Sequence, residues 1–436
     1  MLLLYAEKLT PRLRYTARLI FEDLLGLPLR FTTDQETYLQ THSAKINYSR
    51  IPLQSGIYLQ AAKLLFETDI FEQRFKTSTH RGVPIFFLTG KASQLPFDPL
   101  AAAFYLVSRY EEYIPFIADE HHRFPAEESL LFKLGGLHLP VVNAYAEWLQ
   151  ELLQESHPQL QFKKPQYRFV NSVDIDNAAA YLGKGIFRIL GSYARDLVQL
   201  NFNEMWQRTL SLTGRRADPY ETFDYVQGLQ DQYGFKSIFF VLFTRLGQYD
   251  RSLTRYSSRL HSYIKGIADF SEVGIHPSYR SYQRAELMEE ELLSLERVLR
   301  KDVTRSRQHF LRMSFPITYR HLLELEIEHD YSMGFSTHSG FRAGICTPFR
   351  FYDLEQEIET PLVVHPFPFM DGTYIYGQGM DPEEAWEEIE TYIRTYRKYG
   401  GEFIPVWHNR IFSEKDNEWR GWNQVFEKMV KSASPL

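Results

Sequence analysis

The sequence contains one cysteine, Cys346, among its 436 residues. A single cysteine excludes an intramolecular disulfide framework and a structural zinc site built on several thiolates, so any metal ligands must be histidine or carboxylate side chains. We expect Cys346 itself to be a small buried apolar residue. Long hydrophobic runs are also absent, because no stretch approaches the roughly 20 apolar residues of a membrane-spanning helix. The sequence therefore predicts a soluble protein without membrane insertion.

The start of the chain and its charge balance exclude two further classes. The apolar run from Met1 to Ala6 is interrupted by Glu7, Lys8 and Pro11 before it reaches the length of a signal peptide, which favours a first strand in a cytoplasmic protein. The 49 Lys and Arg residues against 55 Asp and Glu give a formal net charge of −6. This balance provides no broad basic surface, so we expect no nucleic-acid partner. The sequence carries no signal for an oligomeric state.

The chain is longer than one hydrophobic core usually fills, so two domains are expected. In residues 1–160, short apolar runs alternate with helical stretches, which indicates a smaller α/β domain of unknown role. Asp98 to Tyr113 begins with Asp and Pro and keeps apolar residues at helical spacing, so it is predicted to be a helix. The segment Gln154 to Pro165 is polar and contains two prolines, and we place the domain boundary there.

Residues 161–436 show strands that alternate with helices, which is typical of parallel strands joined by right-handed crossovers. Their number and length favour a (β/α)7 barrel over an open sheet. The predicted strands are Tyr167–Val173, Ser237–Phe243, Glu272–His276, a short piece within Val303–Met313, Ser332–Thr337, Pro361–Pro366 and Glu402–Trp407. The predicted helices are Asp218–Tyr233, Ser257–Phe270, Ala285–Lys301, Thr318–His329 and Pro382–Tyr399. A further helical segment, Leu182 to Leu212, would either cover the site or pack on the side of the barrel.

Polar side chains stand at the carboxyl ends of these strands, the edge at which α/β folds place their chemistry. They are Asp174 and Asp176 after the first strand, His276 after the third, Arg307 and His309 near the fourth, and His408 after the last. One acid of an Asp-x-Asp pair can bind a metal while the other acts as a base. One aspartate with two histidines is a credible zinc set that leaves an open position for water.

Each of these residues also has an ordinary structural explanation. The two acids would suit the cap of a turn, His276 the cap of a strand end, His408 a core position and Arg307 the surface. Their joint occurrence at successive strand ends favours a functional site, because acids and bases with perturbed pKa values cluster at such sites. His121 and His122 lie in an irregular loop, where we expect them to face solvent.

Three further residues are candidates for contact with a substrate. His365 ends a predicted strand and is a reserve metal ligand or substrate contact. Arg342 lies between Gly340 and Gly344, where it could meet an anionic substrate group, although the glycines themselves suit a structural turn. Trp407 directly precedes His408 and provides an aromatic ring of the kind that suits a sugar-facing cleft as well as a core.

Four short motifs occur in order at the strand ends. They are Asp174-Ile175-Asp176, Gly274-Ile275-His276-Pro277-Ser278, Arg307-Gln308-His309-Phe310 and Trp407-His408-Asn409. Together they resemble the successive motifs of the polysaccharide deacetylase family, also called the NodB-homology or carbohydrate esterase family 4 fold. The resemblance covers about Phe169 to Asn409. The segment Asp98 to Leu149 is similar to a domain of unknown role that accompanies divergent bacterial members.

The resemblance implies a distorted seven-stranded barrel that hydrolyses an acetyl group on a sugar, usually an N-acetyl group, with a divalent metal that is commonly zinc. It implies that Asp174 is the general base, Asp176 and His276 are metal ligands, Arg307 orients the base and His408 is the general acid. The partner would be an acetylated sugar or oligosaccharide. In a cytoplasmic protein we expect a soluble or lipid-linked glycan precursor rather than a finished wall polymer.

One position departs from the family pattern. The family places a second histidine four residues after the first, and this chain has Arg280 there. A cation at that place would repel a metal ion, so either the ion is lost or another side chain replaces the ligand. We expect His309 to be that ligand, because it stands where the family's arginine motif carries proline. Two alternatives follow: a barrel that binds glycan without turnover, and a hydrolase of a non-sugar amide or imide.

Overall fold

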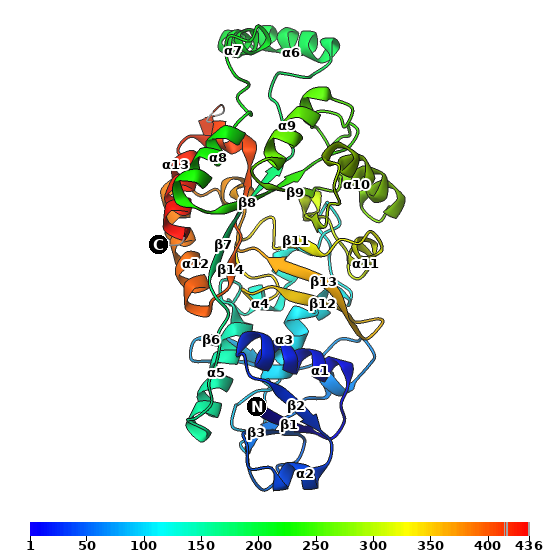
Figure 1. Ribbon diagram of the computed structural model, residues 1–436, viewed down its shortest axis with the longest axis vertical. Helices are drawn as coiled ribbons and strands as arrows, with labels where there is room; N and C mark the ends of the chain where they lie inside the picture. The colour runs from blue at the N-terminus through cyan, green and yellow to red at the C-terminus, as the bar shows by residue number, and fades with distance from the viewer. Residues whose placement is uncertain (414, 416, 435–436) are drawn as a thin grey trace.

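The computed structural model describes residues 1–413, 415 and 417–434. It is elongated, with an N-terminal sheet at one end, a larger α/β region in the middle, and helices α6 (Ile186–Val198) and α7 (Phe202–Leu212) at the other end (Figure 1). Among the described residues, no helix combines the length and the apolar character needed to cross a membrane.

A four-stranded parallel sheet in the order β2-β1-β3-β4 begins the chain. Its strands are β1 (Leu2–Ala6), β2 (Leu29–Thr32), β3 (Lys45–Ser49) and β4 (Ile57–Gln60), and an antiparallel pair follows, β5 (Thr77–His80) and β6 (Val83–Phe86). The α-helices of this region are α1 (Pro11–Ala17), α2 (Gln35–Gln40), α3 (Pro99–Val107), α4 (Leu130–Lys133) and α5 (Val141–Ser156). The region is therefore mixed α/β.

Helix α3 begins where the sequence predicts a helix but ends before Tyr113. The side chain of Asp98 accepts two backbone N–H groups of the first turn, each at 3.0 Å, which stabilises the start of the helix. The helix ends at Val107, and Arg109 then adopts a positive φ of 54° before a short 3-10 turn, Tyr110–Glu112.

The second sheet carries the candidate site and is almost entirely parallel. Its strands follow the order β12-β13-β11-β10-β9-β8-β7-β14, with β15 also paired to β7, and β12 is antiparallel to β13. The strands are β7 (Arg168–Ile175), β8 (Lys236–Val241), β9 (Glu272–Ile275), β10 (Arg305–Ser306), β11 (His329–Met333), β12 (Phe349–Asp353), β13 (Ile358–Pro366), β14 (Glu402–Phe403) and β15 (Val406–His408).

Several strands differ from the sequence-based expectation. The last predicted strand is divided into β14 and β15, because Pro405 between them has no N–H group to donate to a ladder. Strand β11 begins at His329, earlier than the predicted Ser332. Strand β12 was not predicted, since it is an antiparallel addition outside the strand-helix alternation.

The two ends of this row of strands approach each other at one side. An isolated parallel bridge joins Met370, which follows β13, to Val406 in β15, and the backbone N–H of Val406 donates to the carbonyl oxygen of Phe369 at 3.1 Å. The structure thus shows a mixed α/β fold with mainly parallel strands. The closed seven-stranded barrel stays a prediction.

The helices of the second region mostly follow the predicted positions. Helix α12 (Pro382–Tyr399) has the predicted bounds, because Asp381 and Glu384 form a capping box at its start and Gly400 ends it with a φ of 75°. Helix α13 was not predicted. The other α-helices are α8 (Phe223–Tyr233), α9 (Ser258–Ala268), α10 (Ala285–Leu299), α11 (Ile317–Glu324) and α13 (Trp422–Ala433).

The apolar core extends through both predicted domains as one cluster of buried side chains. Arg12 in α1 is buried and donates through Nε to Glu357 Oε1 at 2.9 Å, which ties the first region to the loop between β12 and β13. Cys346 is fully buried in this core, as expected. The two regions are packed together, and the division near residue 160 stays a prediction.

Candidate metal centre

Strand β7 brings both acids of the Asp-x-Asp motif to the carboxyl edge of the sheet. It pairs with β8 on one side and with β15 on the other, and the register sets Asp174 opposite Phe240 and His408. A strand that is paired on both sides lies in the interior, and Asp174 is accordingly buried. Asp176 lies just beyond the last residue of the strand, at the rim of the same site.

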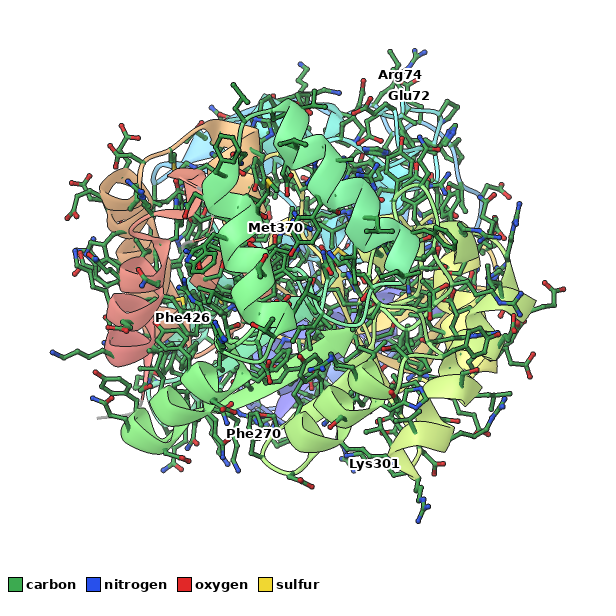
Figure 2. All side chains as sticks on the ribbon, turned by 90° about the horizontal axis from the view of Figure 1, so that it is seen from above. Glu72, Arg74, Phe270, Lys301, Met370 and Phe426 are labelled. Carbon is green, nitrogen blue, oxygen red and sulfur yellow. The ribbon has the colours of Figure 1, made fainter. Side chains whose placement is uncertain are left out.

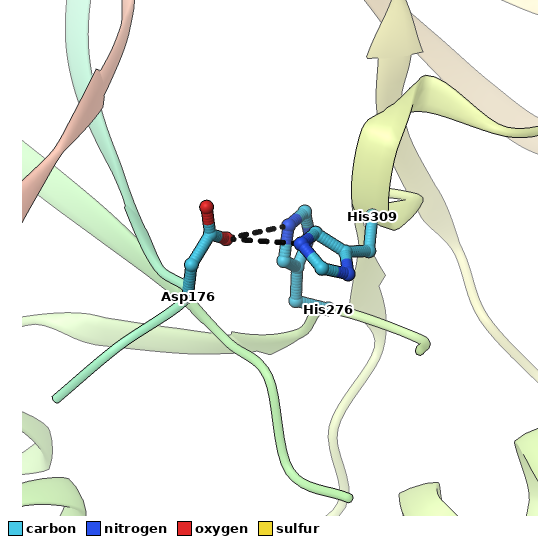
Figure 3. Close-up of side chains that lie close together, drawn as sticks. All are labelled: Asp176, His276 and His309. Carbon is cyan, nitrogen blue, oxygen red and sulfur yellow. Dashed lines mark ion pairs between the residues drawn. The ribbon is translucent and has the colours of Figure 1, made fainter. Parts of the chain in front are cut away.

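Three potential ligands converge beside Asp174. Asp176 Oδ1 lies 3.3 Å from His276 Nε2 and 3.5 Å from His309 Nε2 (Figure 3). The three ligand atoms all lie within 4.8 Å of one another. His276 follows β9 and His309 follows β10, so neighbouring parallel strands supply them. These are the residues expected from the sequence, and they form a possible metal-binding triad.

In both histidines of the triad, Nδ1 already has a hydrogen-bond partner. His276 Nδ1 lies 2.5 Å from the carbonyl oxygen of Arg307, which can only accept, so we assign the ring proton to this nitrogen. His309 Nδ1 lies 3.1 Å from Asp250 Oδ1 and is assigned in the same way. Both Nε2 atoms then direct lone pairs toward Asp176 Oδ1, which is buried and has no hydrogen-bond partner in the described part of the chain. Three such acceptors fit a divalent cation.

A buried arginine fixes the carboxylate of Asp174. Arg307 Nη1 donates to Asp174 Oδ1 at 2.7 Å, Nη2 donates to Ser172 Oγ at 2.9 Å, and Nε donates to the carbonyl oxygen of Tyr331 at 2.9 Å. The other carboxylate oxygen, Oδ2, lies 3.8 Å from His276 Nε2. Asp174 therefore has one oxygen held by a cation and one directed toward the triad, which is the arrangement that a positioned base requires.

His408 lies on the other side of Asp176 and is held by a buried acid. Its Nδ1 lies 2.6 Å from Asp371 Oδ1, and its backbone N–H donates to Asp371 Oδ2 at 2.7 Å. Its Nε2 lies 3.4 Å from Asp176 Oδ2. Burial alone would lower the pKa of His408, but the charges of Asp371 and Asp176 outweigh it and raise the pKa to about 9. The imidazolium can therefore donate a proton through Nε2.

Positive charge surrounds the carboxylate of Asp176. Burial would raise its pKa, but the positive charge of His408, with a smaller contribution from Arg410, holds the pKa well below the ordinary value. Arg410 Nη2 lies 3.9 Å from Asp176 Oδ2. The side chain is thus ionised over the whole neutral range, as a carboxylate ligand must be.

The backbone is strained directly after His309. Phe310 and Leu311 both have positive φ angles, 60° and 53°, a conformation that bulky residues rarely adopt. Such strain persists where surrounding contacts enforce it, and it clusters at functional sites. Arg123 contributes here, because its Nη1 donates to the carbonyl oxygen of Phe310 at 2.7 Å.

A cavity of about 300 Å³ opens over the triad. This volume is at the lower end of the range for small-molecule pockets, roughly 300–1,000 Å³. Part of its wall comes from the N-terminal region, through His121 and Arg123. The expectation that His121 faces solvent is therefore wrong. Its loop folds over the site, and Nδ1 lies 3.2 Å from the hydroxyl of Tyr279. The adjacent His122 is exposed, as expected.

The structure places two of the expected substrate contacts in the core. Arg342 is buried and donates through Nε to Glu112 Oε1 at 3.0 Å and through Nη2 to Oε2 at 2.5 Å, so its charge is neutralised inside the protein. Trp407 is fully buried, and its ring lies 5.2 Å from that of Phe426 in α13. Successive side chains of a strand point to opposite faces, so His408 faces the site and Trp407 faces the helices.

His365 and Arg280 also lie away from the triad. His365 Nδ1 lies 2.8 Å from Glu402 Oε2 and its Nε2 lies 3.0 Å from His329 Nδ1, in a separate cavity of about 500 Å³. Glu402 and His329 begin their strands, so this cavity lies at the amino ends of the sheet. Arg280 is exposed in a short 3-10 turn and is not among the residues that line the site cavity.

Three residues of the site were missed from the sequence. Asp250 and Asp371 hold the outer nitrogens of His309 and His408, and Arg410 stands beside Asp176. Both acids lie beyond the end of a predicted strand, so a search for acids there would have found them as candidates.

Comparison with known proteins gives one family match and several structural likenesses. Residues 2–158 match the model of a family of unknown function (DUF7033). No curated protein matches the chain. The structures with a similar chain path include a putative polysaccharide deacetylase from Mycobacterium smegmatis, at 14% identity and a TM-score of 0.38, covering 61% of this chain and 84% of that one.

Two further structures show similar levels of likeness. A probable polysaccharide deacetylase from Pseudomonas aeruginosa PAO1 has 13% identity and a TM-score of 0.36, covering 61% of this chain and 83% of that one. A 4-alpha-glucanotransferase from Thermococcus litoralis has 12% identity and a TM-score of 0.35, covering 62% of this chain and 38% of that one. The assignment of the candidate site rests on its residues and not on these likenesses.

Proposed function

We propose that this chain is a metal-dependent hydrolase that removes an acetyl group, preferentially an N-acetyl group, from a sugar or glycan precursor. The proposal is carried by one observation: a possible metal triad lies beside two proton-transfer groups, Asp174 held by Arg307 and His408 held by Asp371. Amide hydrolysis needs a base for the attacking water and an acid for the departing amine. The order of these residues along the chain also resembles the motifs of polysaccharide deacetylases.

Asp176, His276 and His309 would hold the ion. Two imidazole nitrogens and one carboxylate oxygen suit zinc and leave an open position for a substrate or water. When bound, a divalent cation polarises the acetyl carbonyl, stabilises the negative charge that develops on its oxygen, and lowers the pKa of water.

The chain's own residues supply the proton transfers. Asp174 Oδ2 takes the proton of the attacking water, while Arg307 keeps the carboxylate directed at the triad. His408 Nε2 donates a proton to the amine that leaves, and Asp371 holds the ring so that this nitrogen faces the cavity. The base and the acid are thus two different side chains on the paired strands β7 and β15, one for each proton transfer.

The walls of the cavity suit a single sugar unit. Met370 and Tyr376 provide apolar surface, whereas Ser336 and Thr337 provide hydroxyl groups. A hydroxyl-rich ring with an apolar face matches such a mixed lining. The small volume favours a monosaccharide group presented at the end or on the side of a larger precursor.

Acetate release with and without metal tests this function. We expect the zinc-loaded protein to release acetate from an N-acetylated sugar, the chelator-treated protein to release none, and added zinc to restore the activity, because the polarised carbonyl is lost with the ion. The assay covers N-acetylated sugars, O-acetylated sugars and cyclic amides. Acetate release that survives chelation, or opening of a cyclic amide without any acetate release, would overturn the proposal.

Asp371→Asn is expected to lower kcat on the same sugar by roughly 10²-fold or more, with KM and metal content unchanged. The amide keeps the size of the side chain but removes the charge that orients and stabilises the imidazolium of His408. Steady-state kinetics and metal analysis check this together. A rise in KM at constant kcat would show instead that Asp371 only shapes the substrate pocket.

A further inference from the structure

Helices α6 and α7 form a hairpin, residues 186–212, that buries an ion pair and exposes apolar side chains. Two polar contacts join its helices: Arg208 Nη2 lies 2.5 Å from Asp196 Oδ2, and the hydroxyls of Tyr193 and Thr209 lie 2.7 Å apart. Both charged side chains are buried between the helices. A helix pair in water normally buries its apolar stripe and exposes its charges, whereas this pair buries an ion pair and leaves large apolar side chains exposed.

The outer surface of the hairpin is apolar. Phe187 is 87% exposed and Val198 is 84% exposed. Of the 22 large hydrophobic side chains exposed in the described part of the chain, eight lie within residues 186–206. They are Ile186, Phe187, Leu190, Leu197, Val198, Leu200, Phe202 and Trp206. An apolar cluster of this density marks a surface that contacts another apolar phase.

The exposed apolar residues follow the helical period. On α6, Ile186, Leu190 and Leu197 fall on one face, and on α7 Phe202 and Trp206 are one turn apart. Tyr193 and Thr209, whose hydroxyls are in contact, lie on the same two faces. Each helix therefore carries exposed apolar side chains that border the polar contact between the two helices.

The same segment is basic within an acidic chain. Residues 182–217 contain six Lys and Arg residues and two acids, whereas the whole chain has a formal net charge of −6. One of the acids, Asp196, is neutralised inside the hairpin by Arg208. Arg188, Arg215 and Arg216 are exposed. This local charge complements an anionic surface.

The hairpin projects from the body of the protein. It stands at the end of the long axis opposite the N-terminal sheet, joined to the rest by two connecting segments (Figure 1), and it lies foremost when the molecule is viewed along that axis (Figure 2). Asp218 fixes the base of these segments, because its carboxylate accepts the backbone N–H groups of Ala180, Tyr181 and Leu182 at 2.6–2.9 Å. The base begins directly after Asp176 and Asn177.

We propose that the α6–α7 hairpin docks this protein on an anionic lipid surface. Helices of 13 and 11 residues are shorter than the roughly 20 residues needed to span a bilayer, so they lie in the plane of the interface. Interfacial helices combine Trp, Phe and Leu on one face with Lys and Arg beside it, and this hairpin has both. The proposal does not depend on the hydrolase function, since it rests on the hairpin alone.

Vesicle co-sedimentation of the full-length protein tests the docking. We expect binding to vesicles of phosphatidylcholine mixed with phosphatidylglycerol, and none to phosphatidylcholine alone, because the arginines need anionic head groups. Phe187→Ser/Trp206→Ser should weaken binding by roughly tenfold or more, because two large apolar side chains no longer enter the interface. The variant Arg188→Gln/Arg215→Gln/Arg216→Gln keeps Phe187 and Trp206 but removes three positive charges. It should also weaken binding by roughly tenfold or more.

A matched control replaces apolar residues elsewhere. Ile51 and Ile117 are 68% and 77% exposed outside the hairpin, and Ile51→Ser/Ile117→Ser should bind like the wild type. Thermal unfolding should be unchanged in all variants, since every substituted side chain is exposed. Absence of vesicle binding by the wild type, or equal binding by the Phe187→Ser/Trp206→Ser variant, would overturn the proposal. A wild-type oligomer that the same variant converts to monomer would overturn it in favour of a second copy of the chain.

Discussion

Asp174→Asn is expected to lower kcat on an acetylated sugar by roughly 10²–10⁴-fold while the protein keeps its divalent metal. The amide has the same shape, and its oxygen can still accept the hydrogen bond from Arg307 Nη1 that now fixes the carboxylate at 2.7 Å. It cannot take a proton from water, so the chemical step slows. Binding should change little, because Asp174 is not one of the three converging ligands.

Acetate-release kinetics and metal analysis on the same preparation check this result. Asp224→Asn is a matched control, since Asp224 is exposed in the first turn of α8, and it should behave like the wild type. A variant with wild-type kcat would remove Asp174 from the role of base. A variant that loses its metal would identify Asp174 as a ligand.

His309→Ala is expected to lose the divalent ion and with it all measurable activity. The substitution removes one of three ligand atoms, so the loss of metal affinity should exceed the roughly 10- to 100-fold that removal of an outer hydrogen-bond partner costs. Arg280→Ala should leave metal content unchanged, because Arg280 is exposed and does not line the cavity. The pair of variants therefore separates the position that supplies the ligand here from the position where the family pattern has one.

Metal analysis and acetate release are measured for both variants beside His122→Ala. His122 is an exposed histidine in the loop that borders the site, so its loss controls for removal of any imidazole from the chain. Wild-type metal content in His309→Ala would contradict the proposed ligand. Loss of metal in Arg280→Ala would show that the 3-10 turn after His276, and not β10, completes the site.

The carboxyl ends of the strands could be predicted because parallel strands bring these ends to one edge. The pairing of β7 with both β8 and β15 makes Asp174 and His408 neighbours although they are distant in sequence. The convergence of His276 and His309 follows from the adjacent β9 and β10. To predict that these residues meet, it is enough to know that successive parallel strands lie side by side, and the alternation of strands and helices indicates this.

Residues whose roles depend on a single contact partner could not be predicted in this way. Arg342 is paired with Glu112, 230 positions away in the chain, and no local pattern reveals that partner. The side of β15 on which Trp407 lies depends on the exact register of one short strand. Asp250 lies in an irregular loop and Asp371 in a short helical turn after β13, and the paths of both segments are set by tertiary packing and not by periodicity.

The first region of the chain shows the same limit. Its α/β character follows from the pattern of apolar runs, but the fold of the loop from Asp119 to Pro125 over the site does not. Arg123 and His121 reach the cavity through contacts with Phe310 and Tyr279. A segment placed in a separate domain by composition thus forms part of the wall of the candidate site.

Metal analysis of the wild-type protein beside Asp176→Ala tests the central claim most directly. Asp176 Oδ1 is the atom on which both imidazole nitrogens converge, at 3.3 and 3.5 Å. We predict one divalent ion per chain in the wild type, with zinc preferred, and none in Asp176→Ala. A wild-type protein that binds no divalent metal under these conditions would contradict the account.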